Sequence, residues 1–321
     1  MKKKAYTERG VLPPIKQKNN LLPVGNAGSW NALIVSYARD NQDQDALHCF
    51  ELMQREGLYS DEGTLTFLLQ ACGKLGDIEK GKKIHHGILS RGLLGKDIVL
   101  GNSLIDMYAK CGALSKSLEV FNELLLRDIV SWNALIAGYA QHGLSEDALK
   151  CFKDMQTESL SPDEVTFMCV LAACCHSGLL DEAQVLFEDM KTKYGISPNF
   201  EHHICMVRAF GRAGHFDKAM SLIKVMPCSD NPSVWLALLG ACRKWVNAKL
   251  GKLAFNEVLK LDKNCGGAYV LMADIFIAAN MQEDAEKIEA MRLKYTIYEN
   301  RKVNLWAEGN QNGCIPFISD T

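Results

Sequence analysis

The hexapeptide SWNALI occurs twice in this chain, at residues 29–34 and again at residues 131–136. The two copies start 102 residues apart. A phrase that returns at such a distance indicates an internal repeat, and the period of a repeat decides the architecture before any single motif does. The stretch around the second copy, IVSWNALIAGYAQHG at residues 129–143, shows what each repeat forms.

A pair of helices is what this stretch and its continuation predict. Four large side chains recur at the spacing i, i+3, i+4 and i+7 and share one face of a helix: Trp132, Leu135, Ile136 and Tyr139. Gly143 breaks that pattern, and Ser145 can cap a second helix. The second helix, EDALKCFKDMQ, has the same apolar spacing, and Ser161 and Pro162 end the unit.

Six consecutive segments fit this frame. In the first round their lengths are 35, 36 and 31 residues, which together span the 102 residues between the two copies. SWNALI therefore returns because a triplet of unequal repeats has begun again. The six segments are residues 27–61, 62–97, 98–128, 129–163, 164–199 and 200–231.

Each predicted hairpin exposes an apolar face that it cannot bury alone, and strand patterns of period two are absent from the sequence. Such hairpins must stack on their neighbours to form a continuous core. The sequence therefore predicts an all-α fold, a right-handed α-solenoid superhelix of helix-turn-helix repeats.

The composition argues against several classes of protein. Hydrophobic residues make up 48% of the chain and charged residues 23%, which is typical of a folded globular protein. The net charge of −2 gives no electrostatic footprint for duplex DNA or an anionic membrane. No apolar run reaches about 18 residues, the length that a membrane span needs. We expect no DNA partner and no membrane partner.

The 12 cysteines are scattered, and no two have CxxC spacing. Several lie among Ala, Leu and Gly in helical patterns, which favours small buried side chains in a reducing compartment: Cys72, Cys111, Cys174, Cys175 and Cys242. The clusters at residues 174–176 and 202–205 contain Cys and His, but they lack the paired spacing of a zinc site. We expect neither a metal nor another cofactor.

Three stretches carry a resemblance to a known family: VSWNALIAGYAQHGLSEDALKCFKDMQ, NSLIDMYAKCGALSKSLEVF and CMVRAFGRAGHFDKAMSLI. They resemble the plant pentatricopeptide repeat (PPR) family, and the unequal lengths resemble its PLS subclass. Residues 232–298 are similar to the first C-terminal extension motif of that subclass, which is helical and tetratricopeptide-like. Residues 299–321 resemble a degraded second extension motif. The two motifs together correspond to the E and E+ extension of the subclass. Residues 1–26 are expected to be a disordered or truncated leader, with no clear transit peptide.

The resemblance implies a mode of reading single-stranded RNA, one base per repeat. In the family the fifth and last residues of each repeat select the base. The corresponding polar residues here are Asn31, Asp61, Thr66, Asp97, Asn102, Asp128, Asn133, Asp163, Asn199 and Asn231. Asn with Asp resembles a uracil reader and Thr with Asp a guanine reader, so the implied core target is U-G-U-U. Met168 and Ile204 lack hydrogen-bonding groups, which makes their repeats spacers.

The second residue of each repeat flanks the base in the family, and three apolar residues fit that role: Val99, Val130 and Val165. A purely structural interpretation stays open for the polar positions. Asn and Asp near a helix start also act as helix caps and first-turn residues.

Relatives of this kind often end in a zinc deaminase (DYW) domain, whose chemistry needs an HxE motif and a CxxC pair. Neither spacing occurs in this chain, and no GxxxxGK phosphate loop is present, so we expect no enzyme. The favoured hypothesis is a site-recognition factor for organellar C-to-U RNA editing, in a mitochondrion or chloroplast. It would recruit a deaminase or editing cofactor in trans through residues 232–321. The alternatives are a helical-repeat protein-interaction scaffold and a truncated paralogue without a specific RNA target.

Overall fold

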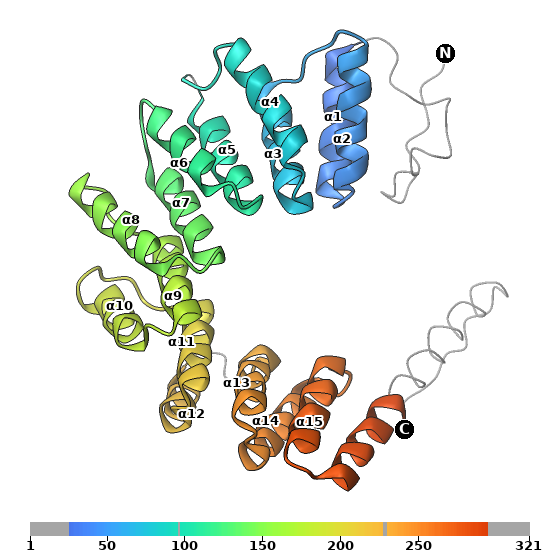
Figure 1. The fold of residues 1–321 in the computed structure, drawn as a ribbon, viewed down its shortest axis with the longest axis vertical. Helices are drawn as coiled ribbons and strands as arrows, with labels where there is room; N and C mark the ends of the chain where they lie inside the picture. The colour runs from blue at the N-terminus through green and yellow to red at the C-terminus, as the bar shows by residue number, and fades with distance from the viewer. Residues whose placement is uncertain (1–25, 96, 227–229, 295–321) are drawn as a thin grey trace, which may run out of the picture. The chain divides into compact units, whose positions relative to one another are not determined.

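The computed structural model describes residues 26–95, 97–226 and 230–294 (Figure 1). All regular structure in these residues is helical, and they contain no β-strand. Residues 1–25 of the expected leader and all of the expected second extension motif, residues 299–321, lie outside the described residues.

The helices form pairs, and we call the first helix of each pair helix A and the second helix B. The A helices are α1 (Ala27–Arg39), α3 (Glu62–Leu75), α5 (Ile98–Lys110), α7 (Ile129–Gln141), α9 (Glu164–Ser177), α11 (Phe200–Ala213), α13 (Pro232–Trp245) and α15 (Gly266–Ala278). The B helices are α2 (Asp43–Arg55), α4 (Ile78–Ser90), α6 (Leu114–Glu123), α8 (Ser145–Thr157), α10 (Leu180–Thr192), α12 (Phe216–Val225) and α14 (Ala248–Leu261). Residues 282–294 are also helical.

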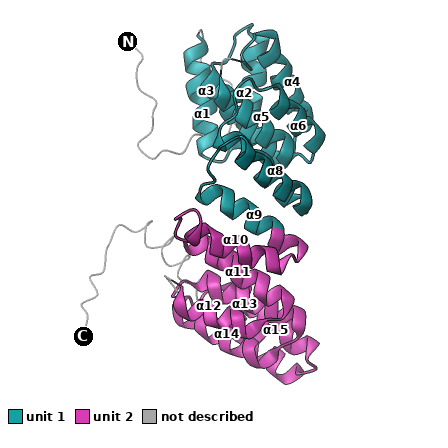
Figure 2. Cartoon of the chain, turned by 90° about the vertical axis from the view of Figure 1, so that its left-hand side faces the viewer, with its two compact units in different colours: residues 1–173 teal, residues 174–321 magenta. Residues whose placement is uncertain are grey.

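The chain divides into two compact units, residues 1–173 and residues 174–321 (Figure 2). Within the first unit each A helix packs on its own B helix and on the next A helix, in the series α1, α3, α5 and α7. Within the second unit α11, α13 and α15 follow one another in the same way. The predicted all-α fold of stacked helix-turn-helix repeats is therefore confirmed.

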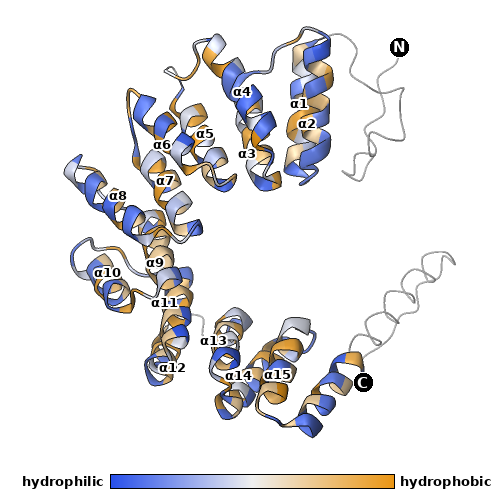
Figure 3. Ribbon diagram, in the orientation of Figure 1, coloured by the Kyte–Doolittle hydropathy of each residue, from blue (hydrophilic) through white to orange (hydrophobic). Residues whose placement is uncertain are grey.

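The core of the described residues consists mainly of buried apolar side chains, and the ribbon of α8 is largely hydrophilic (Figure 3). In the repeat of residues 129–163, which we call the frame repeat, Trp132, Leu135 and Ile136 are buried as their spacing predicts. Gly143 has a φ of 73° in the turn between α7 and α8, a left-handed conformation that favours glycine. The local sequence therefore specifies both the buried face and the turn that reverses the chain.

Neighbouring A helices approach each other closely where small residues face each other. A Cβ atom added at Gly138 of α7 would lie 2.6 Å from the Cβ of Ala109 in α5. In the second unit, a Cβ added at Gly211 of α11 would lie 2.5 Å from the Cβ of Ala241 in α13. Real Cβ atoms do not approach this closely, so each of these contacts requires a glycine on one side.

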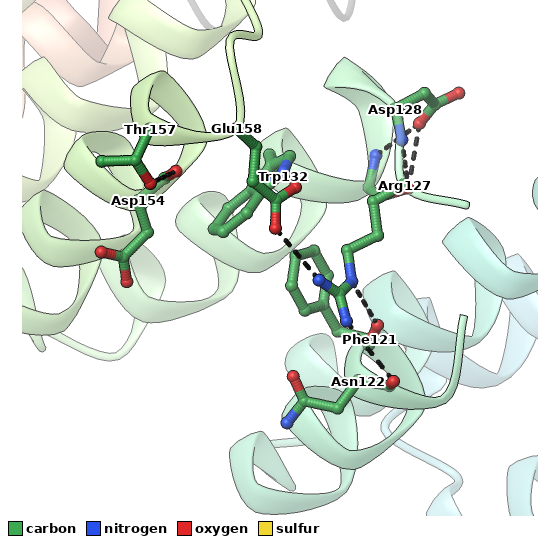
Figure 4. A network of polar contacts seen from close by, with 9 residues as sticks. Phe121, Asn122, Arg127, Asp128, Trp132, Asp154, Thr157 and Glu158 are labelled. Carbon is green, nitrogen blue, oxygen red and sulfur yellow. Dashed lines mark hydrogen bonds and ion pairs between the residues drawn. The ribbon is translucent and has the colours of Figure 1, made fainter. Parts of the chain in front are cut away.

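A polar clasp closes the frame repeat and joins it to the one before (Figure 4). The Trp132 indole donates to Glu158 Oε2 at 3.3 Å, and Arg127 pairs with Glu158 Oε1 at 3.1 Å. Arg127 also lies 4.8 Å above the ring of Phe121, which packs edge-on against Trp132. The first repeat contains the Trp–Glu part of this clasp, because the Trp30 indole donates to Glu56 at 3.0 Å.

The close contact at Gly138 leads to a stability prediction. We expect Gly138→Ala to destabilise the first unit by about 1–3 kcal/mol, because the added methyl group overpacks the α5–α7 contact. The control is Gly87→Ala in α4, where an added Cβ meets nothing within 4 Å. There alanine should stabilise the helix by about 0.5–1 kcal/mol through its better helix propensity. Urea denaturation of both variants measures the difference, and a Gly138→Ala variant as stable as the parent would contradict the packing argument.

Candidate functional site

The Asn and Asp residues selected from the sequence meet in three of the repeats. Asn31 Nδ2 donates to Asp61 Oδ2 at 2.8 Å. Asn102 Nδ2 donates to Asp128 Oδ1 and Asn133 Nδ2 donates to Asp163 Oδ1, each at 3.1 Å. Each pair joins the first turns of one A helix to the residue that precedes the next A helix. The two positions that the family resemblance implies therefore bring three pairs of side chains into contact.

The Asp128 carboxylate both caps a helix and pairs with an Asn side chain. Its Oδ1 accepts from Asn102 and also from the backbone N–H of Ser131 at 2.8 Å, which caps α7. Burial alone would raise the pKa of Asp128, but the hydrogen bonds from Ser131 and Asn102 outweigh it and lower the pKa. The contribution of this group to folding is present above the ordinary pKa of Asp and is lost as the pH falls through the lowered value.

A hydroxyl group completes the site in two repeats, and the sequence analysis did not select it. Ser131 Oγ lies 2.6 Å from Asn102 Oδ1 and 3.0 Å from Asp128 Oδ1. Thr166 Oγ1 lies 2.6 Å from Asn133 Oδ1 and 2.9 Å from Asp163 Oδ1. Both hydroxyls belong to the third residue of the following repeat, so the position in the frame was the signal that could have found them.

The first repeat differs from these two. Asn31 Nδ2 is paired with Asp61, but Asn31 Oδ1 is buried without a hydrogen-bond partner. Thr64, the third residue of the next repeat, donates its backbone N–H to Asp61 Oδ1 at 2.7 Å. The Asn–Asp pair is thus present in this repeat, but no hydroxyl holds the Asn oxygen.

The other selected residues do not form such pairs. The Thr66 hydroxyl donates to the Glu62 carbonyl at 3.1 Å, and Asp97 instead accepts from the backbone N–H of Val99 at 2.8 Å. Asn199 Oδ1 caps α11 by accepting from the backbone N–H of Glu201, and it lies 2.6 Å from the ring Nδ1 of His202. Asn231 caps α13 by accepting from the backbone N–H of Ser233 at 2.9 Å.

The apolar residues selected as base-flanking groups are exposed. Val99, Val130 and Val165 each leave more than half of their surface accessible. By contrast, Asn102 is 8% and Asn133 is 7% exposed. The edge of each buried amide therefore lies near exposed aliphatic side chains that come three residues earlier in the same helix.

A basic residue recurs at the thirteenth position of most repeats, and this too went unnoticed in the sequence: Arg39, Lys74, Lys110, Arg212 and Lys244. Some of these cations hydrogen-bond the end of the preceding A helix. Arg212 donates to the carbonyl of His176 at 3.3 Å, and Lys244 donates to the carbonyl of Arg212 at 2.8 Å. Cations stabilise helix C-termini in this way. In these repeats they also place one positive charge about two turns beyond the fifth residue.

The cysteines behave as small apolar side chains. Cys72, Cys174, Cys175 and Cys242 are buried, and Cys111 is half-buried. Burial raises the pKa of the thiols of Cys72 and Cys242 to about 12, far from the range of a reactive thiolate. Among the described residues, no group of three or more His, Cys, Asp or Glu side chains is arranged to hold a metal ion. The described helices are all too short or too polar to cross a membrane.

Comparison with known proteins places the repeats in a family. A model of the PPR repeat family matches residues 127–176 and 162–200, and a PPR repeat model matches residues 28–58, 63–93, 102–129 and 203–230. Three relatives from Arabidopsis thaliana are pentatricopeptide repeat-containing proteins. At4g33990 is 37% identical over 89% of this chain and 35% of its own length. The mitochondrial At2g03880 is 38% identical over 82% of this chain and 41% of its own length. The chloroplastic CRR2 is 39% identical over 84% of this chain and 41% of its own length.

The chain spans less than half the length of each of these three relatives. Among solved structures, the pentatricopeptide repeat protein PPR10 of maize in complex with an 18-nt psaJ RNA element is similar in fold. Its TM-score is 0.56 at 17% identity, over 84% of this chain and 46% of PPR10. The matched repeats, their order and the shared fold agree, and the chain belongs to the PPR repeat family.

Proposed function

We propose that this protein binds single-stranded RNA in a sequence-specific manner, one base for each of its first four repeats. The observation that carries the proposal is the set of three Asn–Asp hydrogen bonds, 2.8–3.1 Å long, at the same two positions of the frame. Capping alone explains a polar residue such as Asp before each A helix, but it does not require an Asn opposite it. The pairing is therefore additional to the structural role.

The chemistry of the paired amide suits uracil. An Asn amide has two N–H donors and an oxygen with two lone pairs. In the repeats of Asn102 and Asn133 the Asp uses one N–H and the hydroxyl uses one lone pair. One donor and one acceptor remain, and they match the O4 acceptor and the N3–H donor on the pairing edge of uracil. The proposed target is U-G-U-U, read by Asn31, Thr66, Asn102 and Asn133 in this order.

Two further features support binding to a single strand. Exposed Val99, Val130 and Val165 offer aliphatic surfaces on which unstacked bases can lie. The recurring cations near the ends of the A helices can also pair with phosphates. PPR10, whose fold is similar, is described in complex with an RNA element. The guanine in the second place has the weakest support, since Thr66 and Asp97 do not contact each other.

At a finer level, we propose a site-recognition role in organellar C-to-U editing, in which residues 232–321 recruit a deaminase in trans. The triplet of unequal repeats and the C-terminal helices favour the PLS subclass with its E-type extension. The names of two relatives contain the words mitochondrial and chloroplastic, which favours an organelle. Loss of the gene should then abolish editing at one or a few organellar sites, as measured by transcript sequencing. Unchanged editing at every site would remove this role and leave RNA binding open.

A protein-interaction scaffold is the second candidate, and one observation favours it. Val270 and Ile277 are exposed on α15 and lie two turns apart on the same side of that helix. Exposed apolar residues of this kind mark protein-binding faces in helical arrays. The same face would also serve a factor that binds RNA with its first repeats and a protein with its last helices.

Titration with labelled RNA separates the two candidates. A single-stranded RNA that contains UGUU should bind more tightly than one in which all four bases are changed. Its affinity should fall as salt rises, because phosphate contacts release counterions. Duplex DNA of the same sequence is the control and should bind weakly at every salt concentration. The absence of salt-dependent binding to any single strand would favour the scaffold.

The identity of one selected base can be changed. Asn133→Thr removes the amide that contacts Asp163 and keeps a short polar side chain. By family resemblance, the preference at that base should move from uracil towards guanine, by about 1–3 kcal/mol if base-edge hydrogen bonds carry the usual discrimination. Relative affinities for four RNAs that differ only at this base measure the effect. Preferences at the bases read by Asn31 and Asn102 are the internal control, and a variant that ranks all four bases as the parent does would refute the role of Asn133.

A further inference from the structure

We propose that Ser131 and Thr166 are positioning residues for base selection, because their hydroxyls hold the Asn102 and Asn133 amides in one of two possible orientations. This inference rests on the proposed RNA-binding function and adds to it a third residue for each reading pair. Both hydroxyls are buried and each lies 2.6 Å from an Asn oxygen.

The orientation of the Asn102 amide follows from counting donors and acceptors. An ionised carboxylate only accepts, so the amide nitrogen must be the atom that faces Asp128. Asp128 Oδ1 already accepts the backbone N–H of Ser131 and the amide of Asn102. The single hydroxyl proton of Ser131 is therefore donated to Asn102 Oδ1, the nearer of its two acceptors.

The hydroxyl oxygen is itself fixed in place. Ser131 Oγ accepts from the backbone N–H of Asp128 at 3.2 Å, and Thr166 Oγ1 accepts from the backbone N–H of Asp163 at 3.2 Å. Each hydroxyl thus accepts a hydrogen bond from a backbone N–H and donates a hydrogen bond to the Asn oxygen. This arrangement makes the third residue a bridge between the helix cap and the amide that faces the base.

Other repeats show what happens without this bridge. Leu100 occupies the third position after Asp97, and there the Thr66 hydroxyl turns to the Glu62 carbonyl. In the first repeat the Asn31 oxygen has no hydrogen-bond partner. Only where a hydroxyl reaches the Asn oxygen are both ends of the amide held.

Holding both ends matters because a rotated amide exchanges its donor and its acceptor. The rotated form would present the wrong pattern to uracil while keeping nearly the same shape. The Asp carboxylate opposes this rotation from one side and the hydroxyl from the other. Removal of the hydroxyl leaves one restraint, and the preference for uracil should weaken without disappearing.

The test removes each hydroxyl separately and measures base preference in competition binding. Ser131→Ala should lower the preference for uracil at the base read by Asn102 about three- to tenfold, the range that one net hydrogen bond supports. The preference at the base read by Asn133 should stay unchanged. Thr166→Val, which keeps the shape of threonine, should give the converse result. Ser131→Thr and Thr166→Ser retain the hydroxyl and should keep the parental preference.

Ser103→Ala is the matched control, because it removes a hydroxyl from the same helix as Asn102 that bonds only the Val99 carbonyl. Since Ser131 also belongs to the cap of α7, Ser131→Cys is a second variant that fills the volume but donates weakly. A fall in overall affinity with unchanged base ratios in folded variants would overturn the proposal, because it would assign Ser131 and Thr166 to capping alone. A parent protein with no uracil preference at either base would instead refute the proposed function, and the inference with it.

Discussion

Close contact between successive A helices is the constraint on which the rest of each unit depends. Gly138 against Ala109 and Gly211 against Ala241 bring the helices so near that an additional methyl group cannot fit. Between α5 and α7 this close approach accompanies the Asn102–Asp128 hydrogen bond of 3.1 Å. In three repeats an Asn–Asp bond of 2.8–3.1 Å joins one A helix to the residue before the next.

Helix capping and Asn–Asp pairing were alternative interpretations of the sequence, but both involve the same carboxylate oxygen. Asp128 Oδ1 accepts from the backbone of Ser131 and from the amide of Asn102. The cap fixes the carboxylate at the start of α7, and the fixed carboxylate then orients a side chain of the preceding helix. A residue that caps one helix therefore also orders a polar side chain of the preceding helix.

The sequence predicted the stacked helical hairpins, because these follow from periodicity. The Asn and Asp residues that meet in three repeats were selected through the family resemblance, which periodicity alone could not supply. The sequence did not predict that the Thr66 hydroxyl donates to the Glu62 carbonyl while Asp97 caps α5, because a threonine in a helix can bond the carbonyl four residues earlier in place of a more distant partner. Ser131 and Thr166 were missed for a related reason. They look like ordinary first-turn residues, and their contact with the preceding repeat appears only when two A helices are placed side by side.

The repeated cap has a consequence for how such a chain can grow. Asn26 accepts from the backbone N–H of Ser29 at 2.8 Å, as Asp128 accepts from that of Ser131 at 2.8 Å. The joint before residue 27 and the joint before residue 129 are thus chemically alike, and both are followed by SWNALI and a Trp–Glu clasp. A block of three hairpins could be copied or deleted between these joints with every cap intact. Such an array changes its length in steps of three hairpins, and each step keeps the helix cap and the Trp–Glu hydrogen bond at the joint.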